Sequence, residues 1–202
     1  MKPTLPTTTD RVIKNNLEAW FAEASKANIK SGKKWYKEAQ AFTKKLSKRY
    51  GVDSYKVAGV VSALSPNNKW ERNKFDAEQT IKAFLEGKQP SEIKVCTYNN
   101  NKLKAFGILR GDETITGKAP KTHSFAMNVG LCSPDHITID KWHCRACLCK
   151  PSQGVTEAQD KPTAVQYRRV EAITAELAHK HKLKGYEFQA ILWVTIKQAW
   201  ER

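Results

Sequence analysis

GKAPKTHSFAMNVGLCSPDHITIDKWHCR, residues 117–145, is the most informative stretch of this chain. A short turn that contains Gly117 leads into a helix that begins near Lys121. Nineteen residues later Asp140 follows a β-branched run and opens another short helix. Unpaired amides at a helix N-terminus bind phosphate well, and a following acid could act on whatever the turn holds. The stretch therefore predicts chemistry on a nucleic acid.

The turn itself has residues suited to phosphate binding. Gly117 is expected to permit a tight bend, and Pro120 fits a first helical turn because its missing N–H loses no hydrogen bond there. Lys118 and Lys121 add positive charge. Alone this is a weak indication, and an isolated Asp140 would most often be a helix N-cap. Its distance from the turn, spanned by one helix and a loop, favours a place beside the bound ligand.

The composition points to a polyanionic partner. The chain has 202 residues, with 35 Lys and Arg against 20 Asp and Glu, for a formal net charge of +15. Such an excess attracts nucleic acids at long range, although a merely solubilising surface would have the same composition. The length allows one large domain, or two small ones that share a cleft.

No membrane or export signal is expected. Residues 1–3 lead into a polar, threonine-rich stretch, and no segment approaches the roughly 18 apolar residues of a membrane span. The five cysteines are an odd number, and Cys144, Cys147 and Cys149 lie close together. This usage suits a reducing compartment, so we expect a protein of the cytoplasm of a bacterial or phage-infected cell.

Apolar residues recur at helical spacing almost everywhere, and only residues 136–139 look extended. The sequence predicts an all-α fold of roughly nine helices. The first begins near residues 9–10 and has an apolar face of Val12, Leu17, Trp20, Phe21 and Ala24. The others are expected over 34–50, 54–64, 69–85, 98–109, 121–129, 140–149, 163–181 and 186–200, with a polar stretch, 150–161, before the last two.

These helices are expected to form a single domain over residues 1–202. One half is predicted over 54–150, and the other is formed by 1–53 together with 151–202. A cleft that the two halves flank is the usual place for a site.

Two motifs resemble the helix-hairpin-helix DNA glycosylase superfamily, the group that includes endonuclease III. Residues 115–123, ITGKAPKTH, resemble its hairpin Leu-Pro-Gly-Val-Gly-x-Lys-Thr-Ala, and residues 139–145, IDKWHCR, resemble Val-Asp-Thr-His-Val-x-Arg. Upstream, residues 61–66 resemble the family's Leu-Ser-Ala-Gln-Thr segment, and residues 98–102 resemble the helix start before the hairpin. The likeness covers about residues 57–149, close to half of the chain.

The resemblance implies a fold, a reaction and roles for particular residues. Asp140 would assist loss of a base flipped out of DNA, by stabilising positive charge on the sugar or by activating the nucleophile. Lys121 would attack C1′ and form a Schiff base, which permits strand cleavage. The phosphate would be held by the hairpin residues Gly117, Lys118, Ala119 and Thr122.

The chain departs from the family pattern at several positions. Ala119 stands where the hairpin has its second glycine, Thr116 stands where it has proline, and Trp142 and His143 follow the aspartate. These changes leave the substrate open. They also fit a divergent phage branch, which resembles the α-glutamyl/putrescinyl thymine pyrophosphorylases and would act on an activated 5-hydroxymethyl pyrimidine in DNA.

Further contacts to DNA are expected from polar and aromatic side chains near a helix break and after the aspartate. Amides read base edges, and indoles stack on bases. The alternative for the helix break is a capped turn with its tryptophan in the core. The residues concerned are Asn67, Asn68, Trp70, Asn73, Trp142 and Arg145.

No cofactor and no metal are expected. Cys144 and Cys147 lie one turn apart on a predicted helix, where buried thiols behave as small apolar groups, and the cluster spacing of endonuclease III is absent. The expected partner is duplex DNA with a modified or damaged base, bound by a monomer. Two alternatives to a glycosylase stay open: the pyrophosphorylase-type enzyme, and a catalytically silent DNA-binding protein in which Asp140 only caps a helix.

Overall fold

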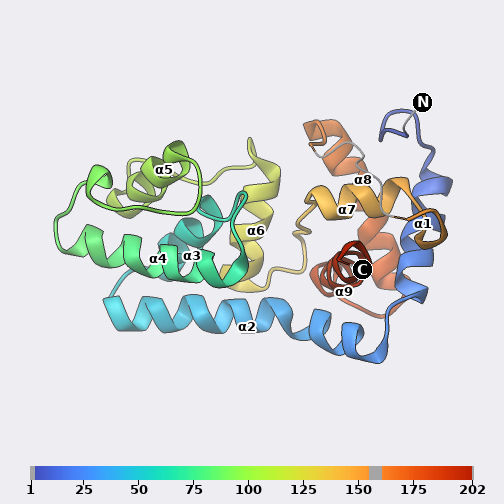
Figure 1. Cartoon of the computed structure of the whole chain (residues 1–202), viewed down its shortest axis with the longest axis horizontal. Helices are drawn as coiled ribbons and strands as arrows, with labels where there is room; N and C mark the ends of the chain where they lie inside the picture. The colour runs from blue at the N-terminus through green and yellow to red at the C-terminus, as the bar shows by residue number, and fades with distance from the viewer. Residues whose placement is uncertain (1–2, 155–160, 202) are drawn as a thin grey trace. The chain divides into compact units, whose positions relative to one another are not determined.

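A computed structural model describes residues 3–154 and 161–201, in which all regular elements are helices (Figure 1). The prediction of an all-α fold with about nine helices is confirmed. Residues 155–160, within the polar stretch expected between two helices, lie outside the described part. The α-helices there are α1 (Asp10–Ala22), α2 (Lys26–Tyr50), α3 (Ser54–Ala63), α4 (Trp70–Leu85), α5 (Asn99–Arg110), α6 (Pro120–Leu131), α7 (Lys141–Leu148), α8 (Ala164–Lys180) and α9 (Gly185–Trp200), with short 3₁₀ helices at Pro90–Glu92 and Pro151–Gln153.

The chain forms two compact units. Unit 1 consists of Met1–Lys37 and Ser133–Arg202, and unit 2 of Glu38–Cys132, so α2 contributes to both. These bounds differ from those of the expected halves, because α7 belongs with α1, α8 and α9. The side chains of Asn16 and Trp20 explain this placement, since they donate hydrogen bonds of 2.9 and 2.7 Å to the carbonyls of Cys147 and Cys149.

In unit 1, α1 packs against α7, α8 and α9. The helix starts where the sequence predicts, because the hydroxyl of Thr9 accepts a hydrogen bond from the amide of Val12. The expected apolar face is only partly right, since Val12 is 41% exposed. The side chains that α1 buries are Ile13, Asn16, Leu17 and Trp20.

In unit 2, α3 packs against α4, α5 and α6. Every residue from Val57 to Ala63 is buried, as expected for a helix that is covered on several sides. The approach to α6 is close: a Cβ added at Gly130 would lie 2.9 Å from the Cβ of Ala58. The carboxylate of Asp53 caps α3 through the amides of Tyr55 and Lys56.

The helix α2 begins at Lys26, whereas the sequence predicts a start at residue 34. The hydroxyl of Ser25 accepts a hydrogen bond from the amide of Asn28 and so stabilises this earlier start. Gly32, which by intrinsic preference weakens a helix, allows close packing on α9. A Cβ added there would lie 2.6 Å from the Cα of Ile191.

Among the described helices, none combines the length and the apolar character that crossing a bilayer requires.

Candidate functional site: the hairpin and Asp140

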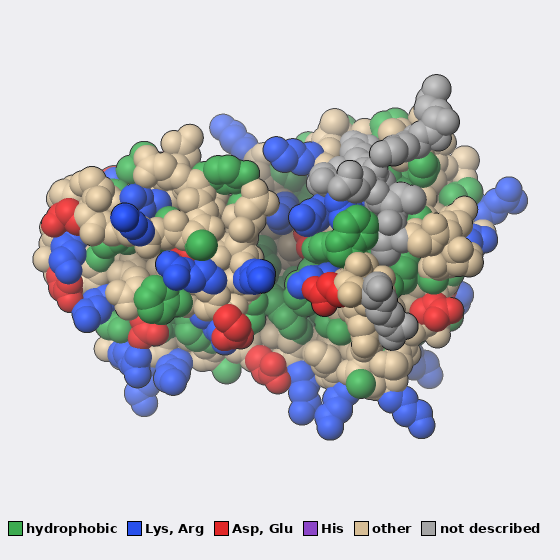
Figure 2. Space-filling model, in the orientation of Figure 1, with side chains coloured by type: hydrophobic (Ala, Val, Ile, Leu, Met, Phe, Trp, Pro, Cys, Tyr) green, Lys and Arg blue, Asp and Glu red, His purple; other side chains and the backbone are tan. Residues whose placement is uncertain are grey.

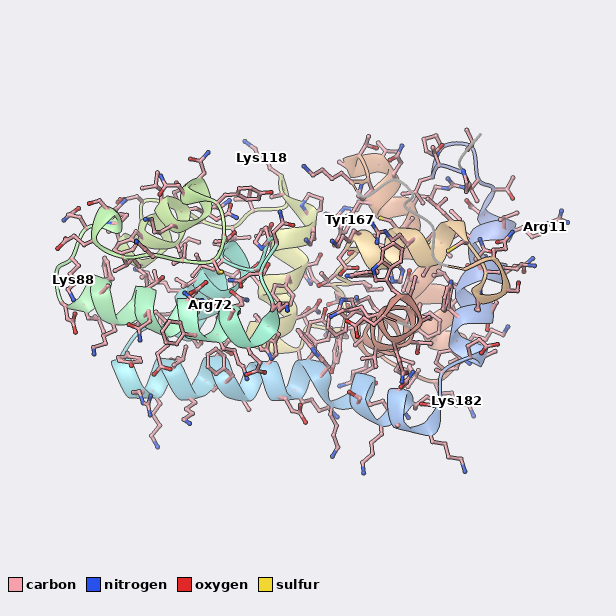
Figure 3. The ribbon with its side chains drawn as sticks, in the orientation of Figure 1. Arg11, Arg72, Lys88, Lys118, Tyr167 and Lys182 are labelled. Atoms are coloured by element: carbon pink, nitrogen blue, oxygen red, sulfur yellow. The ribbon has the colours of Figure 1, made fainter. Side chains whose placement is uncertain are left out.

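The segment between α5 and α6 holds the predicted phosphate-binding turn. The amide of Ala119 donates a 3.1 Å hydrogen bond to the carbonyl of Thr116 and closes a turn around Gly117 and Lys118. The bend expected at Gly117 is therefore present, while the left-handed backbone of this segment is at Gly111 (φ 96°). The side chain of Lys118 projects from this turn (Figure 3).

The N-terminus of α6 follows the turn directly. Pro120 occupies the first helical turn as predicted, and no side chain caps the helix. The amides of Lys121 and Thr122 thus lie in the first turn of a helix without a side-chain cap, a place where anions bind readily. Lys118 and Lys121 are exposed, and Thr122 is half-buried. The hydroxyl of Ser62 donates a 2.6 Å hydrogen bond to the carbonyl of Thr122 and fixes this turn to the end of α3.

Asp140 is half-buried and is the N-cap of α7. One oxygen, Oδ1, accepts a 2.9 Å hydrogen bond from the amide of His143. The carbonyl of Asp140 accepts a second bond, 2.9 Å long, from the amide of Cys144. Its backbone is extended (φ −99°, ψ −178°), as are caps in general. The carboxylate is therefore held at a defined place at the end of a helix.

Tyr167 positions the segment that leads to Asp140. Its hydroxyl donates a 2.7 Å hydrogen bond to the carbonyl of Ile137 and accepts one of 3.1 Å from the amide of Ile139. Both isoleucines are buried, as is Tyr167, which extends from α8 toward α7 (Figure 3). The sequence placed Tyr167 only inside a helix and carried no signal of this role.

His143, whose backbone amide bonds Asp140, is buried, and its imidazole is neutral. The hydroxyl of Thr174 donates to the carbonyl of Val170, so the hydroxyl must accept the hydrogen bond from His143 Nε2, 2.9 Å away. Burial lowers the pKa of His143 to about 3. The other ring nitrogen, Nδ1, is buried without a partner among the described residues.

Trp142 and Arg145, both predicted to contact DNA, are part of one aromatic cluster on α7 and α9. The guanidinium of Arg145 lies 4.8 Å from the ring centre of Trp142 and 4.9 Å from that of Trp200. The two indoles meet edge to face at 5.7 Å. Arg145 is only 5% exposed, so its charge stabilises this cluster and is not presented on the surface. Trp142 is half-buried, and Trp200 is exposed.

The helix break before α4 was predicted to present four side chains to DNA, and only one of them is exposed. Asn73 is 1% exposed and donates a 3.1 Å hydrogen bond to the carbonyl of Val61, so it joins α4 to α3. Trp70 packs edge to face on Phe42 at 6.1 Å. Asn67 is exposed and has a left-handed backbone (φ 55°).

Asn68 belongs to a polar cluster around Asp76. The carboxylate of Asp76 is fully buried. It accepts hydrogen bonds of 2.9 Å from Asn68 Nδ2, 2.8 Å from Arg72 Nε and 2.7 Å from the amide of Cys96. The spacing of Arg72 and Asp76, one helical turn, is the only sequence signal of this cluster.

Further hydrogen bonds join the loop between α3 and α4 to the loop that precedes α5, where an aromatic side chain is exposed. The hydroxyl of Thr97 donates a 2.8 Å hydrogen bond to the carbonyl of Pro66, and Asn67 Nδ2 donates one to the hydroxyl of Tyr98. Tyr98 is 60% exposed. Exposed tyrosine and asparagine side chains of this kind can stack on a base and read its edge. Tyr98 was interpreted from the sequence only as part of a helix start.

The clustered cysteines do not form a metal site with other side chains of the described residues, where no group of three or more His, Cys, Asp or Glu is placed to hold an ion. Cys144, Cys147 and Cys149 are buried thiols that form no disulfide, whereas Cys96 is exposed. Burial raises the pKa of Cys147 well above its ordinary value, and the neighbouring thiols add to this effect. These three cysteines act as small core residues.

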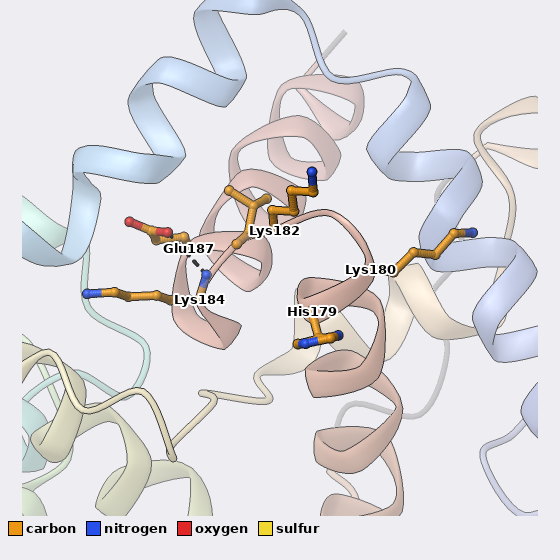
Figure 4. Close-up of a pocket in the computed structure, with 6 residues that line it drawn as sticks. His179, Lys180, Lys182, Lys184 and Glu187 are labelled. Atoms are coloured by element: carbon orange, nitrogen blue, oxygen red, sulfur yellow. Dashed lines mark hydrogen bonds between the residues drawn. The ribbon is translucent and has the colours of Figure 1, made fainter.

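The chain also has a surface hollow of about 710 Å³ at the turn between α8 and α9 (Figure 4). It is lined by His179, Lys180, Lys182, Leu183, Lys184 and Glu187. Figure 4 shows the labelled lysine side chains pointing in different directions, so they do not converge on one ligand. Asp140 is not among the residues that line this hollow.

A model of a family of unknown function, DUF7178, matches residues 1–200. The chain belongs to this family. Searches of curated proteins and of solved structures gave no match. The DUF7178 match includes the hairpin of unit 2 and Asp140 of unit 1. The convergence of Lys121 and Asp140 on one sugar stays a prediction.

Proposed function

We propose that this protein is a DNA glycosylase, which removes a modified or damaged base flipped out of duplex DNA. In this proposal α5, the hairpin and α6 form a helix-hairpin-helix motif that binds backbone phosphate. The exposed Lys118, the uncapped first turn of α6 and the net charge of +15 support phosphate binding.

The observation that carries the proposal is the placement of Asp140. Its carboxylate is half-buried, and one oxygen is fixed by the amide of His143. The backbone before it is fixed by the buried hydroxyl of Tyr167. A carboxylate held in this way can stabilise positive charge on a sugar or orient an attacking water without a large rearrangement. An ordinary surface cap needs no such support from a buried tyrosine.

Lys121, unlike the half-buried Asp140, is exposed. An amine must be neutral to attack C1′, and burial favours the neutral form. Schiff-base formation by Lys121 therefore requires burial that bound DNA would have to supply. For this reason we propose base release as the main reaction and strand cleavage as a secondary one.

A panel of duplex oligonucleotides, each with a different modified base, tests the proposal. Base release is scored as abasic sites, strand cleavage as breaks, and Schiff-base formation as borohydride-trapped adducts. Asp140→Asn should abolish release while DNA binding persists, since asparagine caps a helix as well as aspartate. Lys121→Ala should abolish the trapped adduct and the strand breaks that depend on it, while base release persists. Reaction confined to DNA with an activated 5-hydroxymethyl pyrimidine would instead identify the pyrophosphorylase-type alternative.

One observation favours a second candidate, a DNA-binding protein without catalysis. The N-cap bond from His143 to Asp140 already gives this carboxylate a structural role. A wild-type protein that binds every duplex of the panel, and releases no base from any of them, would establish this candidate and overturn the glycosylase.

A further inference from the structure

The exposed face of α2 carries a row of lysines that the hairpin and Asp140 leave unexplained. In the part of α2 that belongs to unit 1, all five lysines are exposed, and the sequence from 26 to 37 contains no acidic residue. Apart from the adjacent Lys33 and Lys34, successive lysines are three or four residues apart, which places all five on one side of the helix. We call this row the lysine ridge; it consists of Lys26, Lys30, Lys33, Lys34 and Lys37.

The opposite face of the same segment is fixed to α9. Asn28 Nδ2 donates a 3.0 Å hydrogen bond to Gln198, and the hydroxyl of Tyr36 donates one of 3.0 Å to Gln189. Gly32, between them, packs directly on Ile191. Positions 28, 32 and 36 define the buried side, so Lys26, Lys30, Lys33 and Lys34 face away from α9, while Lys37 lies at the edge, within reach of Glu187. Figure 3 shows long side chains that leave α2 on its free side, and Figure 2 shows Lys and Arg side chains along the edge where α2 runs.

The charge of the lysine ridge is almost uncompensated. Lys37 faces Glu187 at 3.8 Å, while no acidic partner is found for Lys26, Lys30, Lys33 or Lys34 among the described residues. Like charges one turn apart destabilise a helix by about 0.2–0.5 kcal/mol per pair. Five lysines in three turns thus oppose the folding of α2, and a bound polyanion would relieve their repulsion.

We propose that the lysine ridge is a second phosphate-binding surface, which contacts the backbone of the nucleic acid independently of the hairpin. The ridge is about 16 Å long, at 1.5 Å per residue. One DNA strand carries a phosphate about every 3.4 Å along the axis, so the ridge matches roughly five phosphates. The ligand class rests on the proposed function, but the ridge itself needs no catalysis.

An anionic membrane is a poorer fit to the same charges. Helices that lie in a membrane surface insert an apolar face beside their basic one. No large hydrophobic side chain of α2 is exposed, and its apolar side packs on the protein. The lysine ridge can therefore contact phosphates but has nothing to insert into a bilayer.

The test compares two variants of equal net charge. One carries Lys26→Gln, Lys30→Gln, Lys33→Gln and Lys34→Gln. The control carries Lys14→Gln, Lys82→Gln, Lys88→Gln and Lys180→Gln, whose lysines are paired with Glu176, Glu86 or Glu18. Glutamine preserves helix propensity. Binding to a fluorescent duplex is measured by anisotropy over a series of salt concentrations, with base release measured at saturating protein.

The ridge variant should lose at least about tenfold in affinity, and its salt slope should fall by about 2–3.6, at roughly 0.9 per phosphate contact. The salt slope of the control variant should differ from the wild-type salt slope by no more than about 1. Equal salt slopes for the two variants would overturn the proposal. Binding to vesicles of phosphatidylcholine and phosphatidylserine is measured in parallel. A ridge variant that binds these vesicles less well than wild type but binds DNA as well as the control would also overturn it.

Failure of the proposed function is distinguishable from failure of this inference. If no base is released but the ridge variant alone loses affinity and slope, the glycosylase fails and the lysine ridge stands. If base is released and Asp140→Asn abolishes release, while the ridge variant binds like the control, the ridge fails and the glycosylase stands. A wild-type chain that does not bind duplex DNA at low salt contradicts both.

Discussion

The hydroxyl of Tyr167 lies 3.1 Å from the amide nitrogen of Ile139 and bridges it to the carbonyl of Ile137. This one side chain on α8 satisfies two backbone groups of a buried segment that belongs to no helix or strand. The segment ends at Asp140, so the direction of the carboxylate depends on a residue 27 positions later in the sequence.

Tyr167→Phe should destabilise unit 1 and disturb Asp140. The change leaves a buried carbonyl and a buried amide without partners, which costs about 2–3 kcal/mol. Urea denaturation measures the loss, and Tyr55→Phe is the control, since Tyr55 is 45% exposed. If the proposed function holds, base release by Tyr167→Phe also falls under conditions where the protein is folded. An unchanged free energy of unfolding would contradict the bridging role.

His143 should make stability depend on pH. Its folded pKa is lowered to about 3, while the unfolded value is about 6.5. Between these values the unfolded chain binds the proton and the folded chain does not. Stability is therefore complete above the unfolded pKa and is lost as pH falls below it, by at most about 1.4 kcal/mol per pH unit.

The measurement is urea unfolding between about pH 5 and 7.5, for wild type and His143→Gln. The free energy of unfolding of wild type should fall as the pH is lowered through this range, and the variant should lack most of this decrease. Glu18 does not contribute to the pH dependence of stability in this range. Burial alone would raise the pKa of Glu18, but hydrogen bonds from Lys180 and His181 outweigh it and lower the pKa. Its contribution is lost only at more acidic pH. Identical slopes for the two proteins would sink the assignment to His143.

Gly32→Ala should destabilise the protein although alanine is the better helix former. In an exposed helix the change would gain about 1 kcal/mol. Here the new Cβ would lie 2.6 Å from the backbone of Ile191, and α2 must move from α9. We expect a net loss of about 2 kcal/mol or more, in the range of overpacking. Thermal unfolding reports it, with the exposed neighbour Ser31→Ala as the matched control.

Asp76→Ala should destabilise unit 2 by about 1–3 kcal/mol, because Asn68 Nδ2 and the backbone amide of Cys96 would lose their buried acceptor. Arg72 contributes less, since its side chain is 45% exposed and water can replace the bond. Asp76→Asn keeps one accepting oxygen and should lose less. Asp112→Ala, which removes an exposed ion pair with Arg110, is the control and should change stability by under about 1 kcal/mol.

The helices could be predicted because their signals are local. Thr9, Asp53 and Thr163 cap helices as short polar side chains do, and Gly111 ends α5 in a left-handed conformation. The membership of α7 in unit 1 could not be predicted, since it depends on bonds from Asn16 to a carbonyl 131 residues away. Long-range pairing of this kind leaves no periodic trace in the sequence.

In the candidate site, too, the features set by local sequence could be predicted and those set by long-range contacts could not. Asp140 was found because a capping acid after a β-branched run is a local pattern, and its N-cap geometry is confirmed. The burial of Asn73 and Arg145 was missed because amide and guanidinium groups are most often exposed. Each is buried through specific partners: a carbonyl of α3 for Asn73, and two indoles for Arg145. Only the folded arrangement shows these partners.

The unequal accessibility of the thiols gives the protein a built-in labelling site. Cys144, Cys147 and Cys149 are enclosed, and the raised pKa keeps Cys147 as an unreactive thiol. A maleimide dye added to the native protein should therefore couple first at Cys96, whose amide is bonded to Asp76. A fluorophore at this position would report movements of the loops that carry Asn67 and Tyr98, without any engineered cysteine.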